Sequence, residues 1–161
     1  MKIKLSLDKQ SINASIKKLD DYADKVDKLP NKVVKRLSED GAKQAKETAM
    51  YMNAYDSGEL VNGIIYEASE NKGKIVSTAP HSAFVEMGTG VVGKNNPNTN
   101  GSIPGWSYDV NEHGEAGWWY IGKDGKPHWT KGMPSRPFMY DTAQILREAI
   151  PYIAKEELKG G

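Results

Sequence analysis

The stretch from Ser77 to Gly90 constrains the fold of this chain more than any other, because it joins three kinds of local structure within fourteen residues. A predicted strand ends at Pro80, whose backbone nitrogen cannot donate a hydrogen bond to a sheet. Residues 82–87 then predict a short helix, with Phe84 and Val85 facing the core. Gly88-Thr89-Gly90 follows, and its glycines allow backbone angles that a side chain would forbid. We therefore expect a sharp junction here, at which Gly88 and Gly90 turn the chain into a loop.

Helical periodicity predicts two long elements before this stretch and one at the end of the chain. The first helix has a narrow apolar stripe with intervals of four and three residues. The stripe consists of Ile12, Ile16, Leu19, Ala23 and Val26. It fits the protein's own second helix, and it also fits a partner helix or a coiled-coil-like seam. Pro30 suits the first turn of that second helix, and a last helix is expected from about Phe138 to Leu158.

Strand patterns are shorter and lie between these helices. Residues 2–7 alternate between polar and apolar side chains, which predicts a half-buried strand. Residues 63–68 and 74–79 predict a hairpin, and residues 118–121 and 126–130 predict a second one around an Asp-Gly turn. These patterns predict an α+β domain spanning 1–161, in which two N-terminal helices and a C-terminal helix pack on a small, mostly antiparallel sheet. A long insertion rich in glycine, asparagine and tryptophan occupies about 88–133.

Several functions fit the composition poorly. The net charge is +1, and the chain has no cysteine, so neither a strong attraction to nucleic acid nor thiolate chemistry is expected. No apolar run suits a signal peptide or a membrane span, which favours a cytoplasmic protein. Gly88 to Gly93 match the dinucleotide fingerprint, but the Lys-Asn-Asn-Pro sequence that follows does not favour the helix that such a site needs. The three histidines have no metal-ligand spacing, so no metal and no cofactor are expected.

One enzymatic alternative rests on carboxylates that lie near aromatic residues. Glycosidases combine two carboxylates with aromatic sugar platforms, and the candidates here are Glu86, Asp109, Glu112 and Glu115. A Gly/Asn loop holds such a pair poorly, so we expect a protein without catalytic activity, and a carbohydrate-binding or carbohydrate-cleaving role stays an alternative. The tryptophans at 106, 118, 119 and 129 fit an exposed protein contact and a small satellite core equally well.

Three short motifs resemble a known family in their order along the chain. They are Ser57-Gly58-Glu59-Leu60 with the following Gly63-Ile64, then Phe84-Val85-Glu86-Met87-Gly88-Thr89-Gly90, then Arg136-Pro137-Phe138-Met139. Together they resemble the tail-component, or head–tail joining, proteins of long-tailed double-stranded-DNA phages and prophages. The resemblance covers about residues 30–155, and the length between Gly90 and Met133 departs from it.

The resemblance implies a structural subunit of the virion neck, assembled in the host cytoplasm as a ring of several copies. Its expected partners are the capsid connector or adaptor and the tail-tube or tail-terminator proteins, with DNA passing through the ring and no sequence-specific contact to it. A minor tail protein acting elsewhere in the tail is the alternative. The motifs also led us to expect that Glu86 pairs with Arg136. The interface candidates are Phe84, Val85, Glu86, Gly88, Thr89, Gly90, Trp106, Trp118, Trp119, Trp129, Arg136, Pro137 and Phe138.

Overall fold

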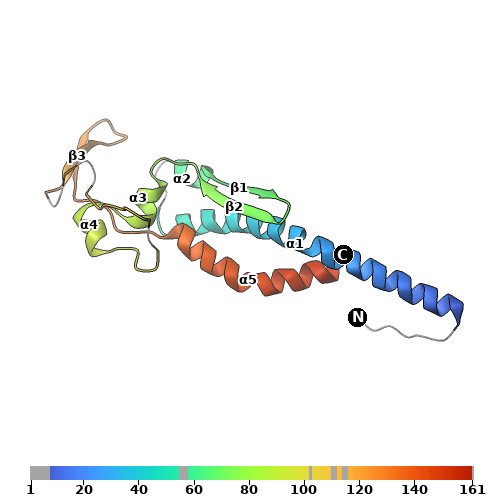
Figure 1. The fold of residues 1–161 in the computed structure, drawn as a ribbon. Helices are drawn as coiled ribbons and strands as arrows, with labels where there is room; N and C mark the ends of the chain where they lie inside the picture. The colour runs from blue at the N-terminus through green and yellow to red at the C-terminus, as the bar shows by residue number, and fades with distance from the viewer. Residues whose placement is uncertain (1–7, 55–57, 102, 110–111, 114–115, 161) are drawn as a thin grey trace.

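The computed structural model describes residues 8–54, 58–101, 103–109, 112–113 and 116–160. Its body is elongated and consists of two antiparallel helices with a β-hairpin beside them (Figure 1). Helix α1 (Lys9–Tyr51) and helix α5 (Phe138–Gly160) pack along each other, and strands β1 (Ile64–Ser69) and β2 (Lys72–Ser77) pack on α1. The α+β class expected from the sequence is therefore confirmed. The alternation at residues 2–7 lies outside the described residues.

Helix α1 runs through Pro30 without a break, so the prediction of two separate N-terminal helices is wrong. Asp8 caps the start of the helix, and its carboxylate accepts a hydrogen bond of 2.8 Å from the N–H of Ser11. A proline inside a helix costs about 3 kcal/mol, because it removes one hydrogen bond and crowds the preceding turn. The apolar spacing continues across Pro30 to Val33 and Leu37, so the two halves share one helical phase. We attribute the continuous helix to this shared phase.

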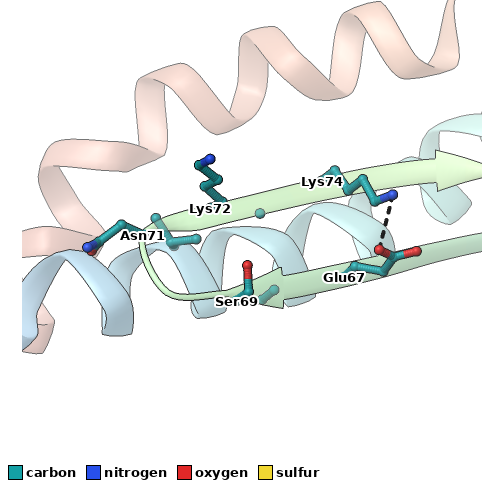
Figure 2. Close-up of a pocket in the computed structure, with 8 residues that line it drawn as sticks. Glu67, Ser69, Asn71, Lys72 and Lys74 are labelled. Carbon is teal, nitrogen blue, oxygen red and sulfur yellow. Dashed lines mark ion pairs between the residues drawn. The ribbon is translucent and has the colours of Figure 1, made fainter.

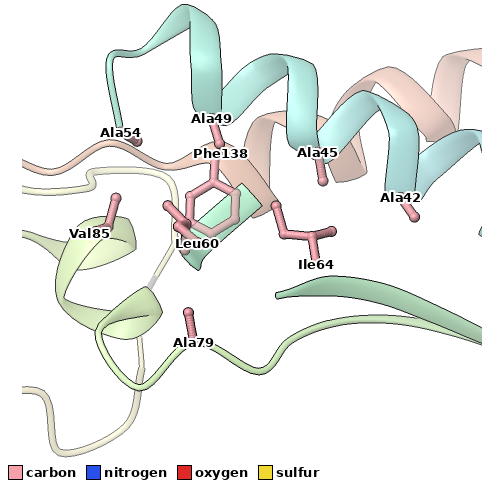
Figure 3. Close-up of a cluster of buried hydrophobic side chains, with 9 residues drawn as sticks. All are labelled: Ala42, Ala45, Ala49, Ala54, Leu60, Ile64, Ala79, Val85 and Phe138. Carbon is pink, nitrogen blue, oxygen red and sulfur yellow. The ribbon is translucent and has the colours of Figure 1, made fainter. Parts of the chain in front are cut away.

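The core lies where α1, α5, the hairpin and helix α2 (Glu59–Asn62) meet (Figure 3). Phe138, Leu60 and Ile64 are fully buried there. Helix α1 contributes small side chains to this contact, which lets its backbone approach closely. Gly41 is the extreme case, since an added Cβ would overlap Ile75 on the hairpin and Leu146 on α5. The core is completed by Ala42, Ala45, Ala49, Ala54, Ala79 and Val85.

The strands form two separate antiparallel hairpins, and not the single small sheet that the sequence suggested. The first pairs Ile64 with Ser77 and Ser69 with Lys72, and its turn is tied to α1 by a 2.6 Å hydrogen bond from the N–H of Asn71 to Asn31. The second hairpin, β3 (Trp118–Ile121) and β4 (Pro127–Thr130), lies at the other end of the molecule (Figure 1). Both hairpins fall close to their predicted positions.

The segment after β2 contains more regular structure than expected. Helix α3 (Ser82–Met87) has the predicted bounds. Helix α4 (Gly90–Asn95) follows almost at once, so Gly90 begins a helix, and the prediction that it starts a long loop is wrong. The chain can form this turn of helix because Gly90 and Gly93 pack against the backbone of residues 88 and 131–133, where no side chain would fit.

Candidate assembly interface

The second and third sequence motifs lie side by side and are joined by backbone hydrogen bonds. Thr89 and Met133 exchange two of them, with N···O distances of 2.9 and 3.1 Å. The N–H of Arg136 donates to the carbonyl of Val85 at 2.8 Å, and the hydroxyl of Ser135 donates to the carbonyl of Glu86 at 2.6 Å. The two motifs are therefore one structural unit, although 44 residues separate Thr89 from Met133. We call residues 82–90 with 131–139 the motif junction.

Glu86 caps helix α5, and the expected pairing with Arg136 is wrong. Its carboxylate accepts hydrogen bonds of 2.9 Å from the N–H of Met139 and 3.0 Å from the N–H of Tyr140. These are two of the amide groups that a helix leaves without partners in its first turn. Burial raises the pKa of Glu86, the two hydrogen bonds oppose that shift, and the charge of Asp141 adds to it. Among the described contacts, no hydrogen bond or ion pair joins the side chains of Glu86 and Arg136. Arg136 contributes its backbone N–H to the junction.

Three glycines make the close approach of the two motifs possible. Gly88, Gly90 and Gly132 have positive φ angles of 81°, 61° and 99°. An added Cβ on Gly88 would lie 2.7 Å from the backbone nitrogen of Ser135, and one on Gly132 would overlap the carbonyl of Thr89. A residue larger than glycine at these positions would therefore push the two backbone segments of the junction apart. The fingerprint glycines serve backbone packing in this structure.

The two apolar candidates on α3 have different environments. Val85 is buried in the core, as expected. Phe84 is 37% exposed, so the prediction that it faces the core is wrong. Its ring lies 5.5 Å from the ring of Trp106, which is partly buried on the insertion. Phe84 and Val85 are neighbours on α3 and lie about 100° apart around the helix, so when Val85 faces the core Phe84 points to the insertion instead.

The second hairpin presents an apolar face at the end of the molecule. Trp119 opposes Trp129, and Ile121 opposes Pro127, so these four side chains share one face of the ribbon. Trp119, Trp129 and Ile121 are 63%, 49% and 70% exposed. The two indole rings meet edge to face with centroids 5.4 Å apart. We call Trp119, Ile121, Pro127 and Trp129 the end face. Its exposure favours a role of Trp119 and Trp129 in a protein contact over a role in a small satellite core.

Trp118 lies on the opposite face of the same hairpin. It is half-buried, and the ring of His113 stacks on it at 5.7 Å. His128 on that face also contacts Asp124 at 2.9 Å, which lowers the pKa of this carboxyl. Within the part of the chain that the structure describes, no three His, Asp or Glu side chains are grouped as metal ligands. Glu115, one of the carboxylates of the enzymatic alternative, lies outside the described residues.

The hollows of the surface lie apart from the end face. One of about 820 Å³ opens between α1 and the first hairpin, and Figure 2 shows Ser69, Asn71 and Lys72 on its wall. The ion pair between Lys74 and Glu67, 3.1 Å long, crosses the hairpin there (Figure 2). A second hollow, of about 410 Å³, adjoins Gly90 and Trp106. The linings of both hollows mix polar with apolar side chains, whereas the end face consists of apolar side chains, so the end face remains the best-defined candidate for a contact.

Comparison with protein families identifies the first half of this architecture. Residues 13–88 match the family model described as "Bacteriophage HK97-gp10, putative tail-component". This segment is similar to the phage tail-component family. It spans most of α1, the first hairpin and α3, and it ends at Gly88 inside the motif junction. No curated protein and no solved structure gives a significant match to the chain.

Phage tail components are parts of the virion that contact other virion proteins, and the similarity over residues 13–88 is to such a component. Among the described helices, none is long and apolar enough to cross a bilayer. The family match ends at Gly88, before the tryptophan-rich part of the insertion that carries the end face. Sequence reasoning missed the helix-capping role of Glu86, because the amides it binds lie more than fifty residues away.

Proposed function

We propose that this protein is a structural subunit of the virion neck that completes the tail and joins the capsid connector to the tail tube. It does so as a ring of identical copies, without catalysis and without a cofactor. The match of residues 13–88 to a phage tail-component family carries the proposal. Its neighbours on the two sides are the connector or adaptor and the tail-tube or tail-terminator proteins, and DNA passes through the ring.

The shape of the subunit supports a joining role. The body of the subunit is elongated (Figure 1). Apolar side chains are exposed in the elements at both of its ends. At one end they belong to the end face on the second hairpin, and at the other end to the first half of α1. A two-stranded hairpin is only marginally stable alone, so covering the end face with a neighbouring protein also stabilises β3 and β4. Trp and Tyr are enriched in such contacts.

Deletion of the gene from a phage that carries it tests the position in the virion. The expected result is filled heads and complete tails that remain separate, seen by electron microscopy, and joined again when the wild-type protein is supplied. Short or absent tails would contradict the neck position and would favour a minor tail protein acting elsewhere in the tail.

The end face is tested by complementation with a double variant, Trp119→Ser with Trp129→Ser. We expect the purified variant to fold and the phage yield to fall at least tenfold, because both aromatic anchors of the contact are gone. The matched control is Tyr120→Ser with His128→Ser, which changes the opposite face of the same two strands. Equal losses in both variants would show that hairpin stability is measured, and a normal yield from the first would remove the end face from the joining contact.

A further inference from the structure

The first half of α1 carries an apolar stripe that stays exposed in the single chain. Ile16, Leu19 and Val26 are 51%, 53% and 42% exposed, and Ile12 and Tyr22 on the same side are similar. We call the seam formed by Ile12, Ile16, Leu19, Ala23 and Val26 the α1 stripe. Apolar patches of this kind on a soluble protein mark contact sites, and most of the stability of a helix in a protein comes from burying its apolar face.

The described elements of the same chain end before they reach the α1 stripe. Near its C-terminus, α5 is held to α1 by Arg36, whose guanidinium lies 2.8 Å from Glu156 and 3.2 Å from Glu157. The turn of the first hairpin reaches α1 at Asn31. The helix continues beyond both contacts toward its N-terminus (Figure 1). The expectation that the stripe packs on the protein's own second helix is therefore wrong, because that helix is the continuation of α1 itself.

The spacing of the stripe is that of a coiled coil. Ile12, Ile16, Leu19, Ala23 and Val26 follow one another at intervals of four, three, four and three residues. This repeat averages 3.5 residues, and it places one seam of side chains against a partner helix in a left-handed supercoil. The partner must therefore be a helix with the same repeat, which a second copy of the chain supplies.

Charges on both sides of the seam decide the orientation of the two copies. Lys18-Leu19-Asp20 is repeated seven residues later as Lys25-Val26-Asp27. Neighbouring residues of a helix are about 100° apart, so the lysines lie on one flank of the seam and the aspartates on the other. With Ile12, Leu19 and Val26 at heptad position d, Asp20 and Asp27 lie at position e. In a parallel pair related by an axis along the helices, they face the g positions of the partner, on the flank where the lysines lie. In an antiparallel pair, like charges would face each other.

We propose that the α1 stripe packs in parallel and in register against the α1 stripe of a second copy of this chain. The inference rests on the self-association in the proposed function, and it is independent of the position in the neck. A pair related by a two-fold axis has an isologous interface that closes with two copies, so it is separate from the heterologous contact that a larger ring needs.

Single cysteines test the proposal directly, because the natural chain has none. In the purified full-length protein, Ile12→Cys and Val26→Cys are oxidised separately. Parallel packing in register predicts a disulfide-linked dimer from each variant alone. Ala14→Cys and Lys28→Cys, which are exposed on the opposite side of the helix, are the matched controls and should stay largely monomeric.

Two results would overturn the proposal. Cross-links that form only when Ile12→Cys and Val26→Cys are mixed would show antiparallel packing. No cross-link above the control level would show that another partner, or none, covers the stripe. Circular dichroism of each variant confirms that the helix is retained. Both results concern the purified chain, so they are distinguishable from a failure of head–tail joining in the gene deletion.

Charge exchange gives a second, independent readout. Asp20→Lys with Asp27→Lys makes both flanks basic, and we expect self-association, measured by sedimentation, to weaken about tenfold at low salt. Adding Lys18→Asp and Lys25→Asp to the same chain exchanges the two flanks completely and should restore association. A fourfold variant that associates as weakly as the double variant would count against the parallel arrangement.

Discussion

Replacing Glu86 with alanine tests whether the motif junction holds helix α5 in place. The change removes both acceptors from the N–H groups of Met139 and Tyr140, now bound at 2.9 and 3.0 Å. Loss of a helix cap typically costs about 1 kcal/mol and at most about 2 kcal/mol. A negative charge at the start of a helix contributes a further ~0.3–1 kcal/mol. The burial that raises the pKa of Glu86 offsets part of this gain.

We therefore expect the free energy of unfolding to fall by about 2 kcal/mol in Glu86→Ala. For a chain of this size, that corresponds to a Tm about 4–8 °C lower. Urea and thermal unfolding at pH 7, followed by circular dichroism, measure both quantities. Wild type and variant are compared at one protein concentration, because self-association stabilises the folded state by mass action.

Glu67→Ala is the matched control. Glu67 is a glutamate whose side chain is 60% exposed, and it pairs only across the first hairpin with Lys74. We expect no measurable change in Tm, because exposed ion pairs contribute little. A second readout is hydrogen exchange at Met139 and Tyr140, which should accelerate in Glu86→Ala alone. If Glu86→Ala unfolds like wild type and these amides stay protected, the capping argument is refuted.

Three further predictions concern pH, the glycines and the end of α5. Burial raises the pKa of Glu86 above 4.5, so the folded state binds the proton of this carboxyl more tightly than the unfolded state does. As the pH falls from 7 toward 4.5, the free energy of unfolding of wild type should therefore rise relative to that of Glu86→Gln, which urea unfolding measures. Gly132→Ala should lower the free energy of unfolding by about 3 kcal/mol or more, because the added methyl group would overlap a backbone carbonyl. Gly125 also has a positive φ but has open space around it, so Gly125→Ala should cost about 1 kcal/mol, and thermal unfolding compares the two variants. Arg36→Ala should accelerate hydrogen exchange in the last two turns of α5, and Lys43→Ala, which loses only a pair within α1, should not.

Local patterns predicted local structure well. The helix over residues 82–87 and both hairpins were readable from strand alternation, turn residues and proline positions, because neighbouring residues decide these elements. Pro30 was misread, because a proline can stand in the first turn of a helix or inside a longer one. Which of the two occurs depends on whether the apolar spacing continues in phase on both sides of the proline. Phe84 was misplaced because it is adjacent to Val85 on the same helix, and adjacent helical residues point about 100° apart.

Contacts between distant segments could not be read in this way. The sequence placed Glu86 and Arg136 in motifs that meet, which the structure confirms, but it paired them by charge. The carboxylate binds backbone amides instead, and backbone amides have no signature in a sequence. Likewise, which face of the second hairpin Trp118, Trp119 and Trp129 would take was decided only by the register of β3 and β4.

The amino-acid sequence by itself determined the elements, their order and the family resemblance, because helix phase, turn chemistry and short motifs are properties of neighbouring residues. It also contained the repeat and the flanking charges of the α1 stripe. Only the tertiary structure decided that this stripe lies beyond the reach of α5 and of the first hairpin, and that Trp119 and Trp129 face outward. Exposure depends on where other segments end in space, and that follows from packing rather than from local sequence.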